Sequence, residues 1–411
     1  MEISGPIMKS EAGGPVAFLL LLGLVASTPP CAYAASSMSD ERIISCFLIG
    51  ATHPSLCPFT GYFGEDPLFR YSVEPIEADL NDPDARKLDR AYYPRTREIL
   101  LQSYDMIFFN DARIGHFTAK QFHDLDYAFR EGGMASYWAF GPGYGQAIAG
   151  SILSDDLPIS DYQGWYHQPW HVVFYRDRDP VFLPFIDLGM ERVQGAAYAW
   201  MRPRPGTVTW ADMQPLDMPW LVSWRPGGTH AGLTWVCADE CDAYWWTLVS
   251  SARGSNPYAI DLATNLVLYS LGRPLISDIA IRREARYRIS TFKAQKLTVL
   301  SVLEWADMFG ANILPLYRQL TDLESYANTA LDSYLDQSYD DSIRVMETAD
   351  SRIAGISANA MDLKDRALFW VYISEWLAVT ASGLISGLVV WSLMVHRRLY
   401  RPVGSTRLAT D

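Results

Sequence analysis

Tyr104-Asp105-Met106-Ile107-Phe108-Phe109-Asn110 is an apolar run of the length and composition typical of a buried strand. A helix is predicted to begin after Thr118, because Gln121 stands three residues further on and can complete a capping box. Gly132-Gly133 should end this helix, and Met134 to Phe140 predicts the next strand. A strand, a helix and a strand at this spacing form a βαβ unit, whose right-handed crossover implies a parallel sheet.

The segments on either side extend the same α/β pattern. Ile43 to Gly50 predicts a first strand and Tyr71 to Ile76 a second. Residues 160–246 are expected to form shorter strands with long connections. Within them, Gly227-Gly228 is flanked by two apolar runs, which is a hairpin signature. The sequence therefore predicts an α/β domain over residues 42–275 with a mostly parallel sheet.

Residues 290–366 have helical periodicity almost throughout and predict a helical stalk, interrupted near 310–315. Two apolar stripes recur at helical spacing; their members are Leu316, Leu320, Leu323 and Tyr326, then Leu335, Tyr339, Ile343, Met346, Ile353 and Ile356. An antiparallel helix pair would bury both stripes. The alternative is that the stripe is a seam for self-association or for another membrane protein.

Two apolar segments predict where the protein lies. Val16 to Ala26, followed by Ala32-Tyr33-Ala34, suits a signal peptide over residues 1–34, with an uncleaved N-terminal anchor as the alternative. Residues 367–395 predict a transmembrane helix, since Trp376 to Val395 contains no charge. The basic tail, residues 396–411, should remain cytoplasmic by the positive-inside rule. We expect a single-pass cell-membrane protein with its N-terminus outside and its C-terminus in the cytoplasm.

The charge balance limits the classes of partner. The chain has 34 Lys and Arg against 47 Asp and Glu, a net charge of −13, which argues against nucleic-acid binding. Residues 1–34 carry −1 and residues 396–411 carry +3, so residues 35–395 carry −15. Such an acidic body favours cationic partners.

Several segments resemble those of one superfamily. They are 104–109, the Thr-capped helix, Glu131-Gly132-Gly133 with the strand into a Gly-rich turn, 219–224, 233–239 and 256–261. Together they resemble the class I glutamine amidotransferase-like superfamily, in particular a membrane-anchored extracytoplasmic branch of uncharacterised prokaryotic proteins. The resemblance covers residues 42–275 and implies a flavodoxin-like, mostly parallel sheet.

The chemistry of that superfamily is not expected here. Its enzymes carry a Cys nucleophile at a tight turn, whereas the turn Gly141-Pro142-Gly143-Tyr144-Gly145 has none and no Cys occurs from 58 to 236. We therefore expect a membrane-anchored binding or scaffold protein with a degenerate, non-catalytic domain, no cofactor, no metal, and a protein or glycan partner outside the cytoplasm. The alternative is an extracytoplasmic hydrolase or carbohydrate-binding protein that uses Asp111, His116 or Asp239.

Candidate ligand-binding residues follow the predicted strands, because ligands of α/β proteins bind at the carboxyl ends of strands. Asn110, Asp111 and His116 follow one strand and could perform acid–base work or hold a metal, although such residues are more often loop caps. The other candidates are Gly141, Gly143, Tyr144 and Gly145, whose turn can also be a plain connection, and Asp239. Trp residues cluster between 138 and 246; they can stack on sugars or fill the core.

Four cysteines remain after removal of a signal peptide. An even count outside the cytoplasm permits two disulfides, Cys46–Cys57 and Cys237–Cys241 being the simplest pairing. Neither spacing supplies the Cys-x-x-Cys pair that a zinc site prefers. Buried free thiols are the alternative.

Overall fold

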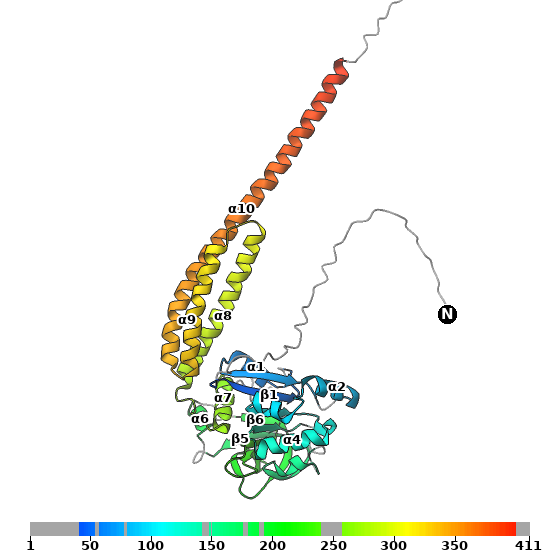
Figure 1. Ribbon diagram of the computed structural model, residues 1–411, viewed down its shortest axis with the longest axis vertical. Coiled ribbons are helices and arrows are strands. Elements are labelled where there is room, and N and C mark those ends of the chain that lie inside the picture. Colours follow the sequence, from blue (N-terminus) through cyan, green and yellow to red (C-terminus); the bar gives the residue numbers. More distant parts are fainter. Residues whose placement is uncertain are drawn as a thin grey trace, which may run out of the picture. The chain divides into compact units, whose positions relative to one another are not determined.

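The computed structural model describes residues 41–53, 57–77, 80–141, 148, 150–175, 180–188, 193–239 and 257–399. They form a nine-stranded mixed sheet with helices packed on it, followed by three long helices (Figure 1). Some predictions fall outside the described residues, namely those on the signal peptide 1–34, on most of the tail 396–411, and on Gly143, Tyr144, Gly145 and Cys241.

One half of the sheet is parallel and contains the predicted βαβ unit. Its strands, in spatial order, are β2 (Phe69–Glu74), β1 (Ile44–Gly50), β3 (Met106–Asn110), β4 (Ala135–Ala139) and β9 (Thr234–Cys237). All neighbours among these five pair in parallel. Every residue of β3 and β4 is buried, as continuous apolar runs require in a sheet covered on both faces.

Helices cover both faces of this parallel half. On one face Phe59 of α1 (Phe59–Glu65) contacts Phe108, with ring centroids 5.0 Å apart. On the other face Phe129 of α4 (Ala119–Arg130) contacts Trp138 at 6.1 Å. The remaining elements of this domain are α2 (Asp82–Tyr92), α3 (Arg97–Ser103), η1 (Ile114–His116), η2 (Ile152–Asp155), α6 (Leu183–Asp187) and α7 (Ala259–Ser270).

The predicted flavodoxin-like, mostly parallel sheet is wrong, although the α/β class fits broadly. Beyond β9 the sheet continues with β8 (Met218–Trp224), β7 (Val208–Gln214), β5 (Ile159–Phe174) and β6 (Val193–Pro203), all joined by antiparallel pairings. The reversal begins at the predicted hairpin. Its first strand, β8, pairs antiparallel with β9, while β9 pairs in parallel with β4. The strands β7, β5 and β6 then each add an antiparallel pairing of their own.

Three helices follow the sheet domain: α8 (Ile279–Met308), α9 (Leu314–Leu335) and α10 (Tyr339–Leu399). Each contacts the other two, and we call α8, α9 and the first part of α10 the helical bundle. The two predicted stripes meet inside it; their buried members are Leu316, Leu320, Leu323, Leu335, Tyr339, Met346, Ile353 and Ile356. A third helix, α8, adds Ile289, Phe292, Val299 and Leu303 to the same core. The stripes are therefore covered within one chain.

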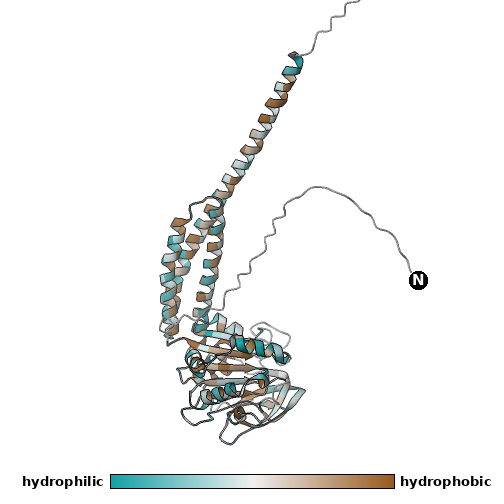
Figure 2. Ribbon diagram, turned by 45° about the vertical axis from the view of Figure 1, so that its right-hand side comes forward, coloured by the Kyte–Doolittle hydropathy of each residue, from teal (hydrophilic) through white to brown (hydrophobic). Residues whose placement is uncertain are grey.

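The last helix continues far beyond the bundle. Figure 1 shows α10 extending past the ends of α8 and α9, and Figure 2 shows this extension to be largely hydrophobic. Its apolar side chains are exposed; Leu384 is 71% exposed and Trp391 66%. Within the described part of the chain, α10 is the one helix long and apolar enough to cross a membrane.

A buried group of charges joins the bundle to the sheet domain. Arg282 of α8 makes ion pairs with Asp66, which follows α1, and with Asp261 of α7. Arg286 donates two hydrogen bonds to the Asp261 carboxylate, at 2.6 and 2.9 Å. Tyr334 of α9 donates to Asp66 at 3.0 Å. Two arginines and two aspartates balance in charge, so the junction is neutral as a whole.

The described cysteines are buried in the sheet domain. Cys46, inside β1, and Cys57 are separate free thiols in the structure and do not form the predicted disulfide. Burial raises the pKa of Cys46 well above its ordinary value and that of Cys57 to about 12. Thiols held protonated in this way are inert as nucleophiles. The Cys237–Cys241 pairing cannot be compared with the structure, because Cys241 lies outside the described residues.

Candidate functional site

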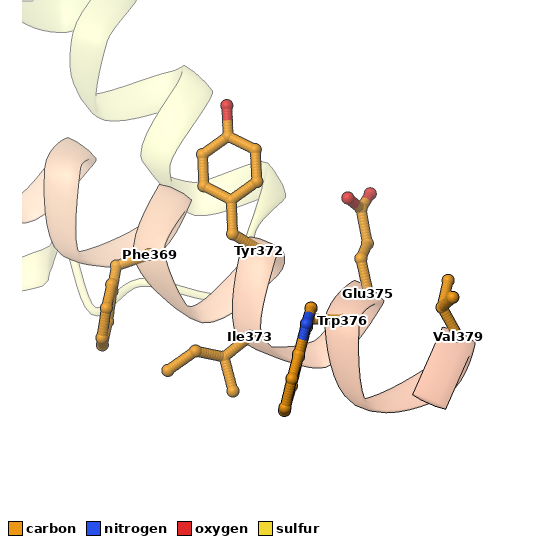
Figure 3. Close-up of a pocket in the computed structure, with 6 residues that line it drawn as sticks. All are labelled: Phe369, Tyr372, Ile373, Glu375, Trp376 and Val379. Carbon is orange, nitrogen blue, oxygen red and sulfur yellow. The ribbon is translucent and has the colours of Figure 1, made fainter. Parts of the chain in front are cut away.

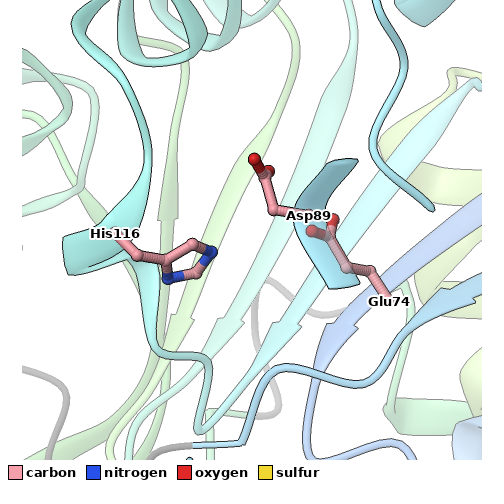
Figure 4. A group of neighbouring side chains, drawn as sticks. All are labelled: Glu74, Asp89 and His116. Carbon is pink, nitrogen blue, oxygen red and sulfur yellow. The ribbon is translucent and has the colours of Figure 1, made fainter. Parts of the chain in front are cut away.

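Three side chains that can ligate a metal meet beyond the ends of β2 and β3. Glu74 is the last residue of β2, His116 lies in η1 after β3, and Asp89 lies in α2. Figure 4 shows the two carboxyl groups side by side with the imidazole facing them. One ligand atom from each residue lies within 4.8 Å of the others. We call these three residues the Glu74 cluster.

Glu74 is fully buried, and neither carboxyl oxygen has a hydrogen-bond partner. Desolvation, with a smaller contribution from the Asp89 charge, raises the pKa of Glu74 to about 9. The hydroxyl of Tyr93 is likewise buried without a partner. A buried polar group without a partner is costly, so such a group in a folded protein calls for an explanation.

His116 is 9% exposed, and neither ring nitrogen makes a hydrogen bond of good geometry, although the Arg113 backbone lies close enough to favour the protonated ring. Burial lowers the pKa of His116, because desolvation of the imidazolium outweighs the favourable charge of Asp89. The imidazole is therefore neutral at pH 7, and one of its nitrogens offers a free lone pair.

Asp89 is positioned by the start of α4. The Gln121 amide donates to Asp89 Oδ1 at 2.5 Å. The same Gln121 accepts, through Oε1, from the Thr118 backbone N–H at 2.7 Å, so the predicted capping box is confirmed. The capping box thus has a second consequence: it fixes the amide that orients a carboxylate of the Glu74 cluster.

The loops around the cluster are tied to one another. Glu77, after β2, forms a β-bridge with Ala112, after β3. The Arg113 backbone N–H donates to the Ile76 carbonyl at 3.0 Å, and the Arg113 guanidinium pairs with Asp82 at 2.5 Å. Because these contacts link the segments that carry Glu74, Asp89 and His116, the three ligand groups belong to one locally ordered unit.

The other predicted residues after β3 have packing roles. Asn110 is buried and its side-chain amide donates to the Ala51 carbonyl at 3.1 Å. At Gly50 any side chain would meet the Asn110 carbonyl, because an added Cβ would lie 2.1 Å from it. Asp111 adopts a left-handed conformation (φ 40°) and packs against Gly141, where an added Cβ would lie 2.2 Å from its Oδ1. The chain itself thus fills the space at the carboxyl ends of β1 and β3.

Gly141 is hydrogen-bonded to Tyr162, a residue that lines a groove. Its carbonyl accepts from the Tyr162 hydroxyl at 3.1 Å. The groove has a volume of about 260 Å³ and is lined by Phe140, Tyr162 and Arg204, among others. The Arg204 guanidinium is already bound to the carbonyls of residues 154, 157 and 159. Asp239 is buried just after β9, at the same edge of the sheet as Gly141.

The Trp-rich region supplies core rather than an exposed sugar-binding face in the part that the structure describes. Five of its Trp side chains are buried: Trp138, Trp170, Trp210, Trp220 and Trp235. Trp210 and Trp235 are in ring contact, with centroids 5.0 Å apart. Trp245 and Trp246 lie outside the described residues.

Sequence reasoning therefore found one of the three cluster residues. His116 was predicted from its position after a buried strand, but it lies with Glu74 and Asp89, which were not predicted. The available signal was Glu74 itself, a carboxylate near the end of a predicted strand. Asp89 gives no local signal, since only the packing of α2 brings it to the sheet edge.

Comparisons with known proteins show no family for this chain. No family model matches it, and no curated protein matches it. One solved structure that matches is a cytoplasmic protein from Salmonella typhimurium LT2, with a TM-score of 0.41 and 12% sequence identity, over 55% of this chain and 99% of that one. The resemblance to the amidotransferase-like superfamily stays a prediction.

Proposed function

We propose that this chain is a membrane-anchored binding or scaffold protein. In this proposal α10 anchors the chain in a bilayer, and the α/β domain binds a partner. The observation that carries it is the continuity of α10, which is packed in the bundle at Met346 and Ile353 and then runs on as an exposed apolar helix without a break. An exposed apolar surface of this extent is unfavourable in water and favourable in lipid.

The side chains of the extension support insertion in a bilayer. Figure 3 shows Phe369, Tyr372, Trp376 and Val379 projecting from a single helix. Aromatic residues cluster where the apolar segment begins, which is where amphipathic rings favour the membrane interface. Glu375, the one charged residue between 368 and 395, lies among these rings, near enough to the end of the segment to reach water.

The orientation and the role of the domain are further parts of the proposal. His396-Arg397-Arg398 directly after the apolar segment favours a cytoplasmic C-terminus, and the predicted signal peptide agrees with an external domain. A non-catalytic role is supported by the absence of any Cys between 58 and 236, which removes the nucleophile of amidotransferase-like enzymes. The acidic body favours a partner that carries positive charge.

Two arginines placed in the apolar segment test the anchor. Leu384→Arg with Leu388→Arg should move the full chain from the carbonate-resistant membrane fraction to the supernatant, because each Arg costs about 3 kcal/mol at the centre of a bilayer. The matched control is Leu297→Arg with Leu314→Arg, at two leucines of α8 and α9 that are also exposed. The control should stay in the membrane. Extraction of the unmodified chain, or equal retention of both variants, would refute the anchor.

A further inference from the structure

We propose that Glu74, Asp89 and His116 bind one divalent transition-metal ion, with Zn²⁺ as the ion that best fits this donor set. Zn²⁺ takes His nitrogen and carboxylate oxygen ligands, and three protein ligands are the number found in zinc sites that keep a position open. The site lies outside the anchor and the partner-binding role proposed above. With three protein ligands, the ion would keep one coordination position that these three residues do not fill.

The spacing of the three ligand atoms suits one ion. Tetrahedral ligands with bonds of about 2.1 Å stand about 3.4 Å apart. The cluster atoms lie within 4.8 Å of one another, so they must approach by about 1 Å or somewhat more. The three groups come from a strand end, a helix and a short 3₁₀ turn, and Figure 4 shows the imidazole facing the other two side chains. Rotation about side-chain bonds can supply such a movement.

The second observation is the missing partner of each buried group. Glu74 is fully buried with both oxygens unsatisfied, and His116 is nine-tenths buried with neither nitrogen in a hydrogen bond of good geometry. Most buried polar groups in folded proteins form hydrogen bonds, so packing alone does not explain why these two side chains lack them. A cation between them would satisfy both residues at once, and its charge of +2 would balance the two carboxylates beside a neutral imidazole.

The surroundings also resemble those of metal ligands. Gln121 donates to one oxygen of Asp89, which orients the carboxylate and leaves the other oxygen available. Such hydrogen bonds from outside the ligand set are usual around metal sites. The donor set separates the candidate ions: Mg²⁺ and Ca²⁺ prefer six or more oxygen ligands, whereas an imidazole with two carboxylates suits Zn²⁺ and its neighbours.

Zn²⁺ titration of the full chain in detergent micelles, after treatment with a chelator, tests the proposal. Isothermal calorimetry should show one ion bound per chain. Glu74→Gln and His116→Asn should each weaken the affinity at least 100-fold. Glu131→Gln and His123→Asn are matched controls at exposed positions and should leave it unchanged. Co²⁺ in place of Zn²⁺ should give visible absorption bands in the unmodified chain and the controls alone.

If substitution of the buried Glu74 or His116 prevents folding, Asp89→Asn serves as a further test of the site. Asp89 is partly exposed, so this variant should fold, which circular dichroism can verify, and it should lose Zn²⁺ affinity as well. The proposal is overturned if the unmodified chain binds no ion stoichiometrically. It is equally overturned if the folded Asp89→Asn variant binds Zn²⁺ as tightly as the unmodified chain, which would assign the ion to surface carboxylates.

Discussion

Glu74 links the stability of the protein to pH. Its raised pKa, about 9, means that the folded chain without metal keeps this carboxyl neutral where the unfolded chain, with a pKa of about 4.3, has lost the proton. Between these values the folded state binds one proton more than the unfolded state, so the free energy of unfolding decreases as pH rises. The slope from this residue alone is at most about 1.4 kcal/mol per pH unit, and it ends above pH 9.

We therefore expect Glu74→Gln to reduce the loss of stability between pH 7.0 and 8.5. Gln has a similar shape and does not titrate. This interval lies above the ordinary pKa of His, about 6.5, so His116 contributes little to the difference. Urea unfolding in the presence of a chelator, monitored at both pH values, measures it. Glu131→Gln, an exposed substitution, should keep the slope of the unmodified chain. Equal slopes in all three proteins would show that Glu74 is ionised when folded.

At the scale of elements, the buried charges at the junction connect α8 of the bundle with α7 and with Asp66, which follows α1. Burial alone would raise the pKa of Asp66, but the positive charges of Arg282 and Arg286 outweigh it and lower that pKa. The four charged groups are almost wholly inaccessible to solvent. A buried ion pair contributes little net stability when it is intact, but loss of one partner leaves an uncompensated charge. The junction is thus sensitive to single substitutions.

Asp261→Asn should destabilise the chain by about 3–5 kcal/mol, because Arg282 and Arg286 would both lose a charged partner in the interior. Thermal unfolding in detergent measures the effect. Asp341→Asn is the matched control: it breaks the exposed pair with Arg344 and should cost less than about 1 kcal/mol. Similar losses in both variants would contradict the role of burial. If only the bundle lost stability, the buried charges at the junction would not contribute to the core of the sheet domain.

The elements differ in how far the sequence predicted them. The strands β1, β3 and β4, the capping box of α4 and the hairpin between β8 and β9 depend on residues close together in the chain, and these predictions agree with the structure. The antiparallel half of the sheet was missed, because the order of β5, β6 and β7 depends on pairings between distant segments. The Glu74 cluster was missed for the same reason: Glu74, Asp89 and His116 come from three separate elements.

At the scale of the whole molecule, α10 is the element that relates the bundle to a membrane. Its first half shares a core with α8 and α9, while its second half has apolar side chains with no cover in the described part of the chain. A bend or loop between the halves would separate the bundle from the anchor; instead the helix is continuous over 61 residues. The charged residues at its end then determine which side of the membrane the bundle occupies.

The proposed orientation predicts which positions a membrane-impermeant thiol reagent can reach. Thr348→Cys, at an exposed site of the bundle, should be labelled on intact cells, whereas Arg398→Cys, after the apolar segment, should be labelled only after permeabilisation. Labelling of the unmodified chain gives the background from its own cysteines. Arg397→Glu with Arg398→Glu should reduce the labelling of Thr348→Cys, because the positive charges that hold the C-terminus inside are replaced. If intact cells were labelled at Arg398→Cys but not at Thr348→Cys, the topology would be the opposite of the proposed one, with the acidic domain facing the cytoplasm.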